Sequence, residues 1–269
     1  MNGEKMKQQI ASTFNDVAER YDGNLFFSRS AKRLVDHLAP LAEQRVLDLS
    51  TGTGIVALEI AQRHQQTQVE ALDLSEGMLA QARQKATAQG VQNVHFQQGD
   101  VEKLAYDDGS FDRISCGYGM FFYPEMELTF QRIFRKLKAG GRLVFSSFTA
   151  DAFQPYAELF LQRIETEYQI ETPIRSLARL KSVEQMRALS ALADPAKIKV
   201  EVYPIAYSIT LAEWWALLNS AGYKGLLDQL NAEQLPRFKE DHLAEVAALI
   251  MDGRLALNAD TMFAVVEAK

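Results

Sequence analysis

The strongest constraint on the fold is a turn with two glycines between an apolar strand and an apolar helix, in residues 46–57, VLDLSTGTGIVA. Glycine lacks a Cβ atom, so the backbone at Gly52 and Gly54 can lie directly against a ligand. The amino end of the following helix favours negative charge on that ligand. The segment therefore predicts a binding site at the end of a strand, and leaves open which ligand it holds.

Strand and helix patterns continue to alternate after this turn. We expect strands at 45–49, 69–74, 94–98, 111–116 and 143–147, and helices at 55–64, 75–88 and 126–138. Parallel strands need long crossover segments, and these are usually helices. The alternation therefore predicts an α/β, Rossmann-like fold with a mostly parallel sheet, helices on both faces, and a ligand at the carboxyl ends of the strands.

The remaining segments are expected to extend this core without forming a second domain. We predict a single domain over 1–269, with helices in 1–44, the ligand-binding core in 45–148, a helical insertion in 149–196, and C-terminal strands and helices in 197–269. The helices of the first segment are expected at 5–21 and 29–39. In the last segment, strands are expected at 198–209 and 261–267, and helices within 211–254. The helical segments after residue 148 are expected to cover the sheet.

Charge and cysteine content narrow the class of partner. The net charge of −6 and the absence of a basic stripe argue against a nucleic-acid partner. Cys116 is the single cysteine, so no internal disulfide can form, and it fits a small core residue. No run reaches the roughly 18 apolar residues of a membrane span, and the first ten residues lack an apolar signal core. We expect a soluble, cytoplasmic protein that binds a small molecule and no metal.

Three further features bear on the ligand. Asp73 ends the second strand about 20 residues after the turn, where a carboxylate binds the ribose hydroxyls of either NAD or S-adenosylmethionine. Asp48 would repel a pyrophosphate but favour a cationic amino-acid group. Asp100 follows the third strand and can accept a hydrogen bond from an adenine amino group. Together with the helix, glycine turn and strand FRKLKAGGRLVFSS, these residues favour S-adenosylmethionine.

At these residues the sequence resembles class I S-adenosylmethionine-dependent methyltransferases, and within them the group of ubiquinone/menaquinone-biosynthesis methyltransferases. The matching segments are VLDLSTGTG (46–54), ALDLSEGMLAQAR (71–83), FQQGDVEKLAYDDGSFDRI (96–114), FRKLKAGGRLVFSSF (134–148) and the amino-terminal FNDVAERYD (14–22). The resemblance covers about residues 10–148. It implies a seven-stranded sheet whose last strand is antiparallel, and residues 261–267 fit that strand.

The resemblance also implies which residues bind the cofactor, and that the reaction converts the cofactor to S-adenosylhomocysteine. The implied cofactor-binding residues are Tyr21, Asp48, Ser50, Gly52, Thr53, Gly54, Asp73, Leu74, Met78, Asp100, Val101 and Gly117. Ser50 stands where a glycine is expected. Several of these residues also fit purely structural roles: Met78 and Tyr21 as core positions, Asp100 as a turn former.

The catalytic residues and the methyl acceptor are less defined. Tyr118 and Tyr123 follow the fourth strand, near the expected transfer point, and His242 lies on a late helix; these are the candidates for positioning or proton transfer. The segment GYGMFFYP (117–124) favours a hydrophobic or aromatic acceptor. The quinone enzymes carry an Arg-Asn pair where this chain has Phe121 and Phe122, which argues against a quinone precursor.

Two other functions stay open on the sequence alone. The fold is compatible with a binding or cyclase role without methyl transfer, and the glycine turn is also compatible with a nicotinamide-dependent oxidoreductase. A macromolecular acceptor is disfavoured because no N/D-P-P-Y/F motif of amino-methylating enzymes is present.

Overall fold

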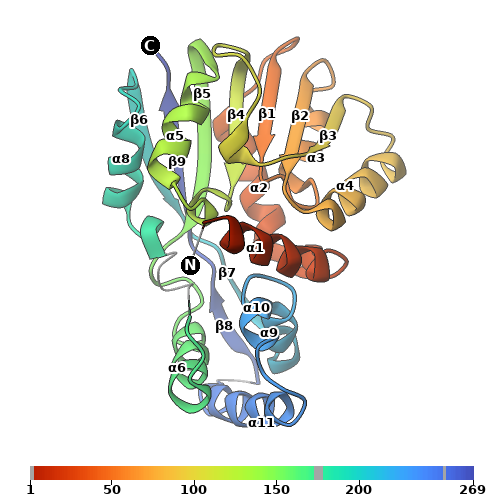
Figure 1. Ribbon diagram of the computed structural model, residues 1–269, viewed down its shortest axis with the longest axis vertical. Coiled ribbons are helices and arrows are strands. Elements are labelled where there is room, and N and C mark those ends of the chain that lie inside the picture. Colours follow the sequence, from red (N-terminus) through yellow and green to blue (C-terminus); the bar gives the residue numbers. More distant parts are fainter. Residues whose placement is uncertain (1–2, 173–177, 251–252) are drawn as a thin grey trace.

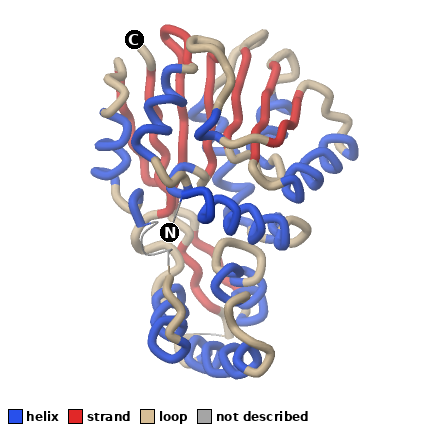
Figure 2. The backbone as a smooth tube through the Cα atoms, viewed as in Figure 1, coloured by secondary structure: helices blue, strands red, loops and turns tan. Residues whose placement is uncertain are grey.

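The computed structural model describes residues 3–172, 178–250 and 253–269. A seven-stranded sheet in the order β3-β2-β1-β4-β5-β9-β6 forms one layer, with helices on both faces (Figures 1 and 2). Its strands are β1 (Arg45–Leu49), β2 (Gln68–Asp73), β3 (Val94–Gln98), β4 (Phe111–Gly117), β5 (Leu137–Phe148), β6 (Lys197–Tyr203) and β9 (Thr261–Glu267). Neighbouring strands from β3 to β5 pair in parallel, and β9 is antiparallel to both β5 and β6. The predicted α/β class and the predicted final strand are confirmed.

Both faces of the sheet are buried because apolar side chains alternate across it. On β1, Val46 packs into a cluster with α2 (Leu25–Leu38) and α3 (Ile55–Arg63) on one face. Leu47 and Leu49 point to the other face, toward α5 (Met126–Arg135) and α8 (Val183–Ala191). Burial on both faces explains why β1 and β9 are mostly apolar, whereas the edge strands β3 and β6 expose polar side chains. α4 (Glu76–Ala88) links β2 to β3.

A helical cover lies beyond the carboxyl ends of the strands (Figure 1). It consists of α6 (Tyr156–Tyr168), α9 (Leu211–Leu218), α10 (Lys224–Leu227), α11 (Gln234–Ala247) and a two-stranded sheet of β7 (Ala206–Ile209) and β8 (Leu255–Asn258). Its core contains the fully buried rings of Phe160, Trp214 and Phe238. The amino-terminal helix α1 (Gly3–Val17) runs between the sheet and this cover (Figure 1). Short 3-10 turns complete the chain: η1 (Tyr21–Gly23), η2 (Val101–Lys103), η3 (Met120–Phe122) and η4 (Ala178–Leu180).

Three of the expected elements differ in the structure. The single strand expected at 198–209 is two strands, because Pro204 has no amide hydrogen to continue the ladder and Ile205 instead donates to Asp260 Oδ1 at 2.8 Å. β8 was not predicted as a strand. β5 begins at Leu137, six residues before its expected start, and its pairing with β4 shifts register between Phe111 and Arg113. Of the helices expected in 149–196, α6 joins the cover, whereas α8 packs on β6 and β9.

Candidate active site

The turn after β1 brings three residues with positive φ to the edge of the sheet: Ser50 (50°), Gly52 (55°) and Gly54 (78°). The two glycines have different surroundings. A Cβ atom at Gly52 would meet nothing within 4 Å, so its backbone faces open space. A Cβ atom at Gly54 would lie 3.0 Å from Ala82 Cβ and 3.2 Å from Phe96. Gly52 therefore borders the site, whereas Gly54 allows α3 to pack closely against α4 and β3.

A first cavity, of about 100 Å³, lies at the carboxyl ends of β1 to β4; we call it the strand-end cavity. Eleven of the residues singled out from the sequence line it: Tyr21, Ser50, Gly52, Asp73, Leu74, Met78, Asp100, Val101, Gly117, Tyr118 and Tyr123. The residues come from five separate segments of the chain. Their convergence follows from the parallel sheet, which brings the ends of neighbouring strands to one edge.

A second, smaller cavity of about 40 Å³ adjoins the first and includes Asp48 and Thr53 in its wall. Ser50, Gly52 and Gly117 line both cavities, so the glycine turn separates them. All the expected cofactor-binding residues except Gly54 therefore line one of these two adjoining cavities along the edge of the sheet.

Asp73 is held by backbone amides at the centre of this strip. Its Oδ2 accepts from Gly52 N at 2.7 Å, and its Oδ1 accepts from Ser75 N at 2.8 Å. Burial raises the pKa of Asp73, while these amides act to lower it. Each carboxylate oxygen has further lone pairs with which it can accept from a ligand.

Asp48 is buried, and its carboxylate makes hydrogen bonds within the protein that the sequence did not indicate. Its two oxygens accept from Ser115 Oγ and Thr51 Oγ1, both at 2.6 Å. Burial raises the pKa of Asp48 to about 6, although these hydroxyls act to lower it. Its carboxylate therefore fixes the start of the glycine turn to β4, and it borders only the smaller cavity.

Two charged residues, Lys7 and Asp22, attach the amino-terminal segment to the site through ion pairs, and sequence reasoning missed both residues. Lys7 of α1 donates to Asp100 Oδ2 at 2.7 Å and Glu102 Oε2 at 3.1 Å. Burial acts to raise the pKa of Asp100, but the hydrogen bonds from Lys7 and from the Glu102 amide, together with the charges of Lys7 and Lys103, outweigh it, and the pKa lies below its usual value. Asp22 bridges Thr53 Oγ1, at 2.5 Å, and Lys85 Nζ, at 2.6 Å. No local signal reveals such contacts, because the partners lie 31 to 95 residues apart.

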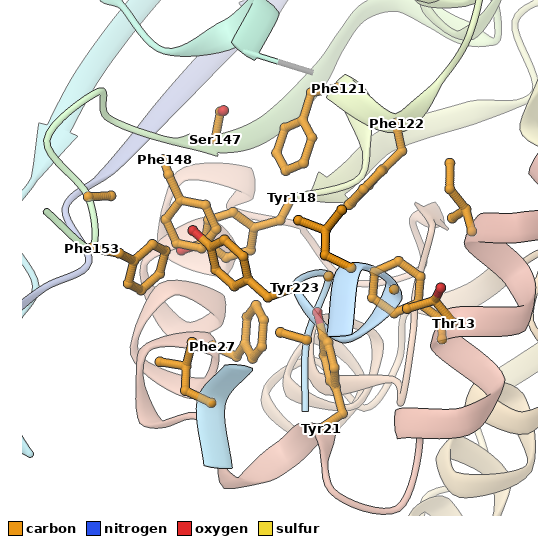
Figure 3. Close-up of a pocket in the computed structure, with 18 of the residues that line it drawn as sticks. Thr13, Tyr21, Phe27, Tyr118, Phe121, Phe122, Ser147, Phe148, Phe153 and Tyr223 are labelled. Atoms are coloured by element: carbon orange, nitrogen blue, oxygen red, sulfur yellow. The ribbon is translucent and has the colours of Figure 1, made fainter. Parts of the chain in front are cut away.

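A third cavity, of about 250 Å³, lies between the strand-end cavity and the cover, and we call it the aromatic cavity (Figure 3). Its wall includes Phe26, Phe27, Phe121, Phe148, Phe153 and Tyr223. It shares Ile10, Phe14, Tyr21, Tyr118 and Phe122 with the strand-end cavity, so these side chains form a common partition. The ring of Tyr21 stacks on Phe27 with centroids 4.4 Å apart.

The two tyrosines proposed from the sequence lie at this junction. Tyr118 hydroxyl is 2.7 Å from Thr261 Oγ1, and its ring stacks on Phe148 with centroids 4.2 Å apart. Tyr123 hydroxyl is 2.8 Å from Ser50 Oγ. Burial raises the pKa of both phenols, so each is protonated at neutral pH and can take part in hydrogen bonds.

The structure places His242, the third candidate for positioning or proton transfer, away from the three cavities. The side chain is fully buried in the cover and lines none of the three cavities. Its Nε2 accepts from Trp214 Nε1 at 3.0 Å, and burial lowers its pKa to about 4. The apolar cover thus holds a neutral imidazole in a structural role.

The strand order and the cavities at the strand ends define a class I S-adenosylmethionine-dependent methyltransferase. The sequence matches the model of the ubiE/COQ5 methyltransferase family over residues 2–165, and the chain belongs to that family. The cofactor is S-adenosylmethionine, which decides against a nicotinamide cofactor, and the chain transfers a methyl group to a small molecule.

Two relatives agree with this assignment, and a solved structure shares the fold. A demethylmenaquinone methyltransferase of Thermus thermophilus is 35% identical over 160 residues, covering 56% of this chain and 72% of the relative. Aklanonic acid methyltransferase DauC of a Streptomyces species is 32% identical over 150 residues, covering 55% and 68%. The crystal structure of the Bacillus subtilis protein YcgJ superposes with a TM-score of 0.61 at 19% identity, covering 90% of this chain and 98% of that one.

Proposed function

We propose that this enzyme methylates a small, hydrophobic, ring-containing acceptor held in the aromatic cavity. The observation that carries the proposal is the common partition of Tyr21, Tyr118 and their neighbours between the aromatic and strand-end cavities. Because these side chains line both cavities, a cofactor in one and an acceptor in the other come together where the two cavities adjoin. A volume of about 250 Å³ is small for a ligand site and suits one or two fused rings.

The residues along the sheet edge divide between the two ends of the cofactor. Leu74, Met78 and Val101 line the apolar part of the strand-end cavity and suit the adenine ring, with Asp73 on the ribose hydroxyls. Gly52 and Gly117 border the methionine end, and Thr53 adjoins it in the smaller cavity. Asp100 reaches the adenine side, where it shares its carboxylate with Lys7.

The reaction needs alignment more than proton chemistry. The cofactor supplies a methyl group on a sulfonium, and the acceptor atom must lie in line with it at about 3–3.5 Å. Tyr118 is fixed by Thr261 and Phe148, and Tyr21 by Phe27, so both rings present rigid surfaces at the partition. The apolar wall excludes water. Protonated phenols at this place position oxygen atoms of the acceptor.

The relatives' names support a ring-containing acceptor. They act on demethylmenaquinone and on aklanonic acid. In this chain Phe121 and Phe122 add two more rings to the wall of the aromatic cavity. The acceptor class is therefore aromatic, and a quinol ring falls within it.

The test combines cofactor binding and turnover. S-adenosylhomocysteine at about 100 times its Kd should stabilise the wild type by roughly 2.7 kcal/mol in thermal unfolding. Asp73→Ala should remove most of that shift, whereas Leu249→Ala, on the exposed surface, should retain it. The wild type with S-adenosylmethionine should methylate 1,4-naphthohydroquinone in the presence of a reductant. A full shift in Asp73→Ala would refute the ribose assignment, and transfer only to non-aromatic acceptors would refute the acceptor class.

A further inference from the structure

A third of the residues that line the aromatic cavity lie beyond the segment that defines the family. The family match ends at residue 165, whereas Lys181 and a group on α9 and α10 complete the wall. That group consists of Leu217, Ala221, Gly222, Tyr223, Gly225, Leu226 and Gln229. We therefore expect these later segments to determine how the acceptor of this enzyme differs from the acceptors of its relatives.

Lys181 is the one charged residue among the described residues that line the aromatic cavity. The rest of the wall is apolar or carries neutral polar groups, and no Asp or Glu belongs to it. Within the described ranges, no hydrogen bond or ion pair of the Lys181 ammonium is found, although its backbone is well bonded. A cation without a partner at the edge of an apolar cavity attracts an anionic group on whatever enters it, because the local dielectric is lower than in water.

Hydrogen bonds hold the backbone of Lys181 and of the residues just before it in place. Its amide donates to Gln185 Oε1 at 2.7 Å, and its carbonyl accepts from Ala150 N at 3.1 Å, just after β5. Two residues earlier, Arg179 donates to the carbonyls of Phe121, at 3.2 Å, and Tyr123, at 2.6 Å. The same short segment thus holds the aromatic loop in place and presents Lys181 to the cavity.

We propose that the acceptor of this enzyme carries a carboxylate, and that Lys181 binds it at the mouth of the aromatic cavity. The proposal rests on the function proposed above, and it specifies the acceptor as an aromatic acid. Lysine serves here as a flexible point charge on an exposed stem, so it determines which acceptor binds and takes no part in the methyl transfer.

Two probes of the same shape test this proposal: 2-naphthoate, which is charged, and 2-naphthamide, which is neutral. Their Kd values are measured with saturating S-adenosylhomocysteine. The wild type should bind 2-naphthoate about tenfold more tightly, equivalent to roughly 1.4 kcal/mol. Lys181→Met should bring the ratio to about one without weakening 2-naphthamide, and Lys181→Arg should retain most of it. The preference should also decrease with added salt, because the cation is exposed.

Lys197→Met is the matched control, since Lys197 is an exposed lysine at the start of β6 and lines no cavity. It should leave the tenfold ratio unchanged. Equal binding of the two probes by the wild type, failure of both to bind, or a ratio that survives in Lys181→Met would each overturn the proposal. Methylation of the neutral naphthohydroquinone by an enzyme without carboxylate preference would overturn this proposal alone and leave the proposed function standing.

Discussion

Adding a single methyl group at Gly119 tests how the glycine turn and the loop after β4 fit together. Gly119 has φ −97° and ψ −32°, which alanine adopts without strain, so Gly119→Ala acts through contact alone. The new Cβ would lie 2.5 Å from Ser50 Cβ, 2.8 Å from Ser50 Oγ and 2.9 Å from Cys116 Sγ. The first of these atoms is rigidly attached to the backbone and cannot rotate away.

The expected cost follows from that overlap. Overpacking a tight core site typically costs 1–3 kcal/mol, and we expect about 2–3 kcal/mol here because a rigid atom is involved. For a chain of this size, each kcal/mol lowers Tm by roughly 2–4 °C. Gly119→Ala should therefore lower Tm by roughly 4–12 °C.

Ser50→Gly removes the two closest atoms and should rescue part of that loss. By itself this change relieves a left-handed backbone that costs a non-glycine residue about 1–2 kcal/mol. Against this, it forfeits the hydrogen bond to Tyr123, about 1 kcal/mol, and adds chain entropy of about 0.5–1 kcal/mol. These opposing effects leave the single variant within about 1 kcal/mol of wild type, and its affinity for S-adenosylhomocysteine within about tenfold.

Urea denaturation of the wild type, both single variants and the double variant gives the coupling free energy. We expect the double variant to be at least about 1 kcal/mol more stable than the sum of the single effects. Rescue should be incomplete, because Cys116 Sγ still lies 2.9 Å from the new methyl group. Additivity within about 0.5 kcal/mol would show that Ser50 and Gly119 do not constrain each other, and the reasoning would be wrong.

Two further predictions concern buried titratable groups. Burial raises the pKa of Asp48 to about 6, above its unfolded value, so the stabilisation that comes from its protonation is complete below about pH 4 and is lost as the pH rises through 6. Relative to Asp48→Asn, the wild type should lose up to about 3 kcal/mol of unfolding free energy over that interval. Equal pH profiles for the two proteins would contradict this. His242→Phe removes the acceptor of the hydrogen bond from the Trp214 indole, so it should lower the free energy of unfolding by about 1–3 kcal/mol while kcat stays within about twofold. A loss of kcat of about a hundredfold with an unchanged Tm would place His242 in the reaction.

The ligand-binding core could be predicted because its signals are local. The strand, turn and helix around Gly52 and the carboxylate at Asp73 each belong to one short segment, and a parallel sheet necessarily brings them to one edge. The spacing did not distinguish Gly52 from Gly54, since both need positive φ and only the packing of Ala82 and Phe96 separates their roles.

The rest of the site depends on contacts between distant segments. Lys7 meets Asp100 across 93 residues, and the position of His242 follows from a cover whose packing no periodic pattern defines. Pro204 itself is a local signal for the division of residues 198–209, but the pairing of β7 with β8, about 50 residues later in the chain, is not. These features are set by tertiary packing, which local sequence patterns do not encode.

The place of β9 has a consequence for how the molecule is made. The last strand in the sequence lies between β5 and β6, so neither can complete its hydrogen bonding until residues 261–267 have been synthesised. At about 5–20 residues per second, the ribosome needs roughly 6–24 s to travel from the end of β5 through β9. During that time the nascent chain carries an open, apolar strand edge that can pair with other chains. The sheet therefore cannot close before β9 is made, and a chain cut short before β9 exposes the edges of β5 and β6 to aggregation.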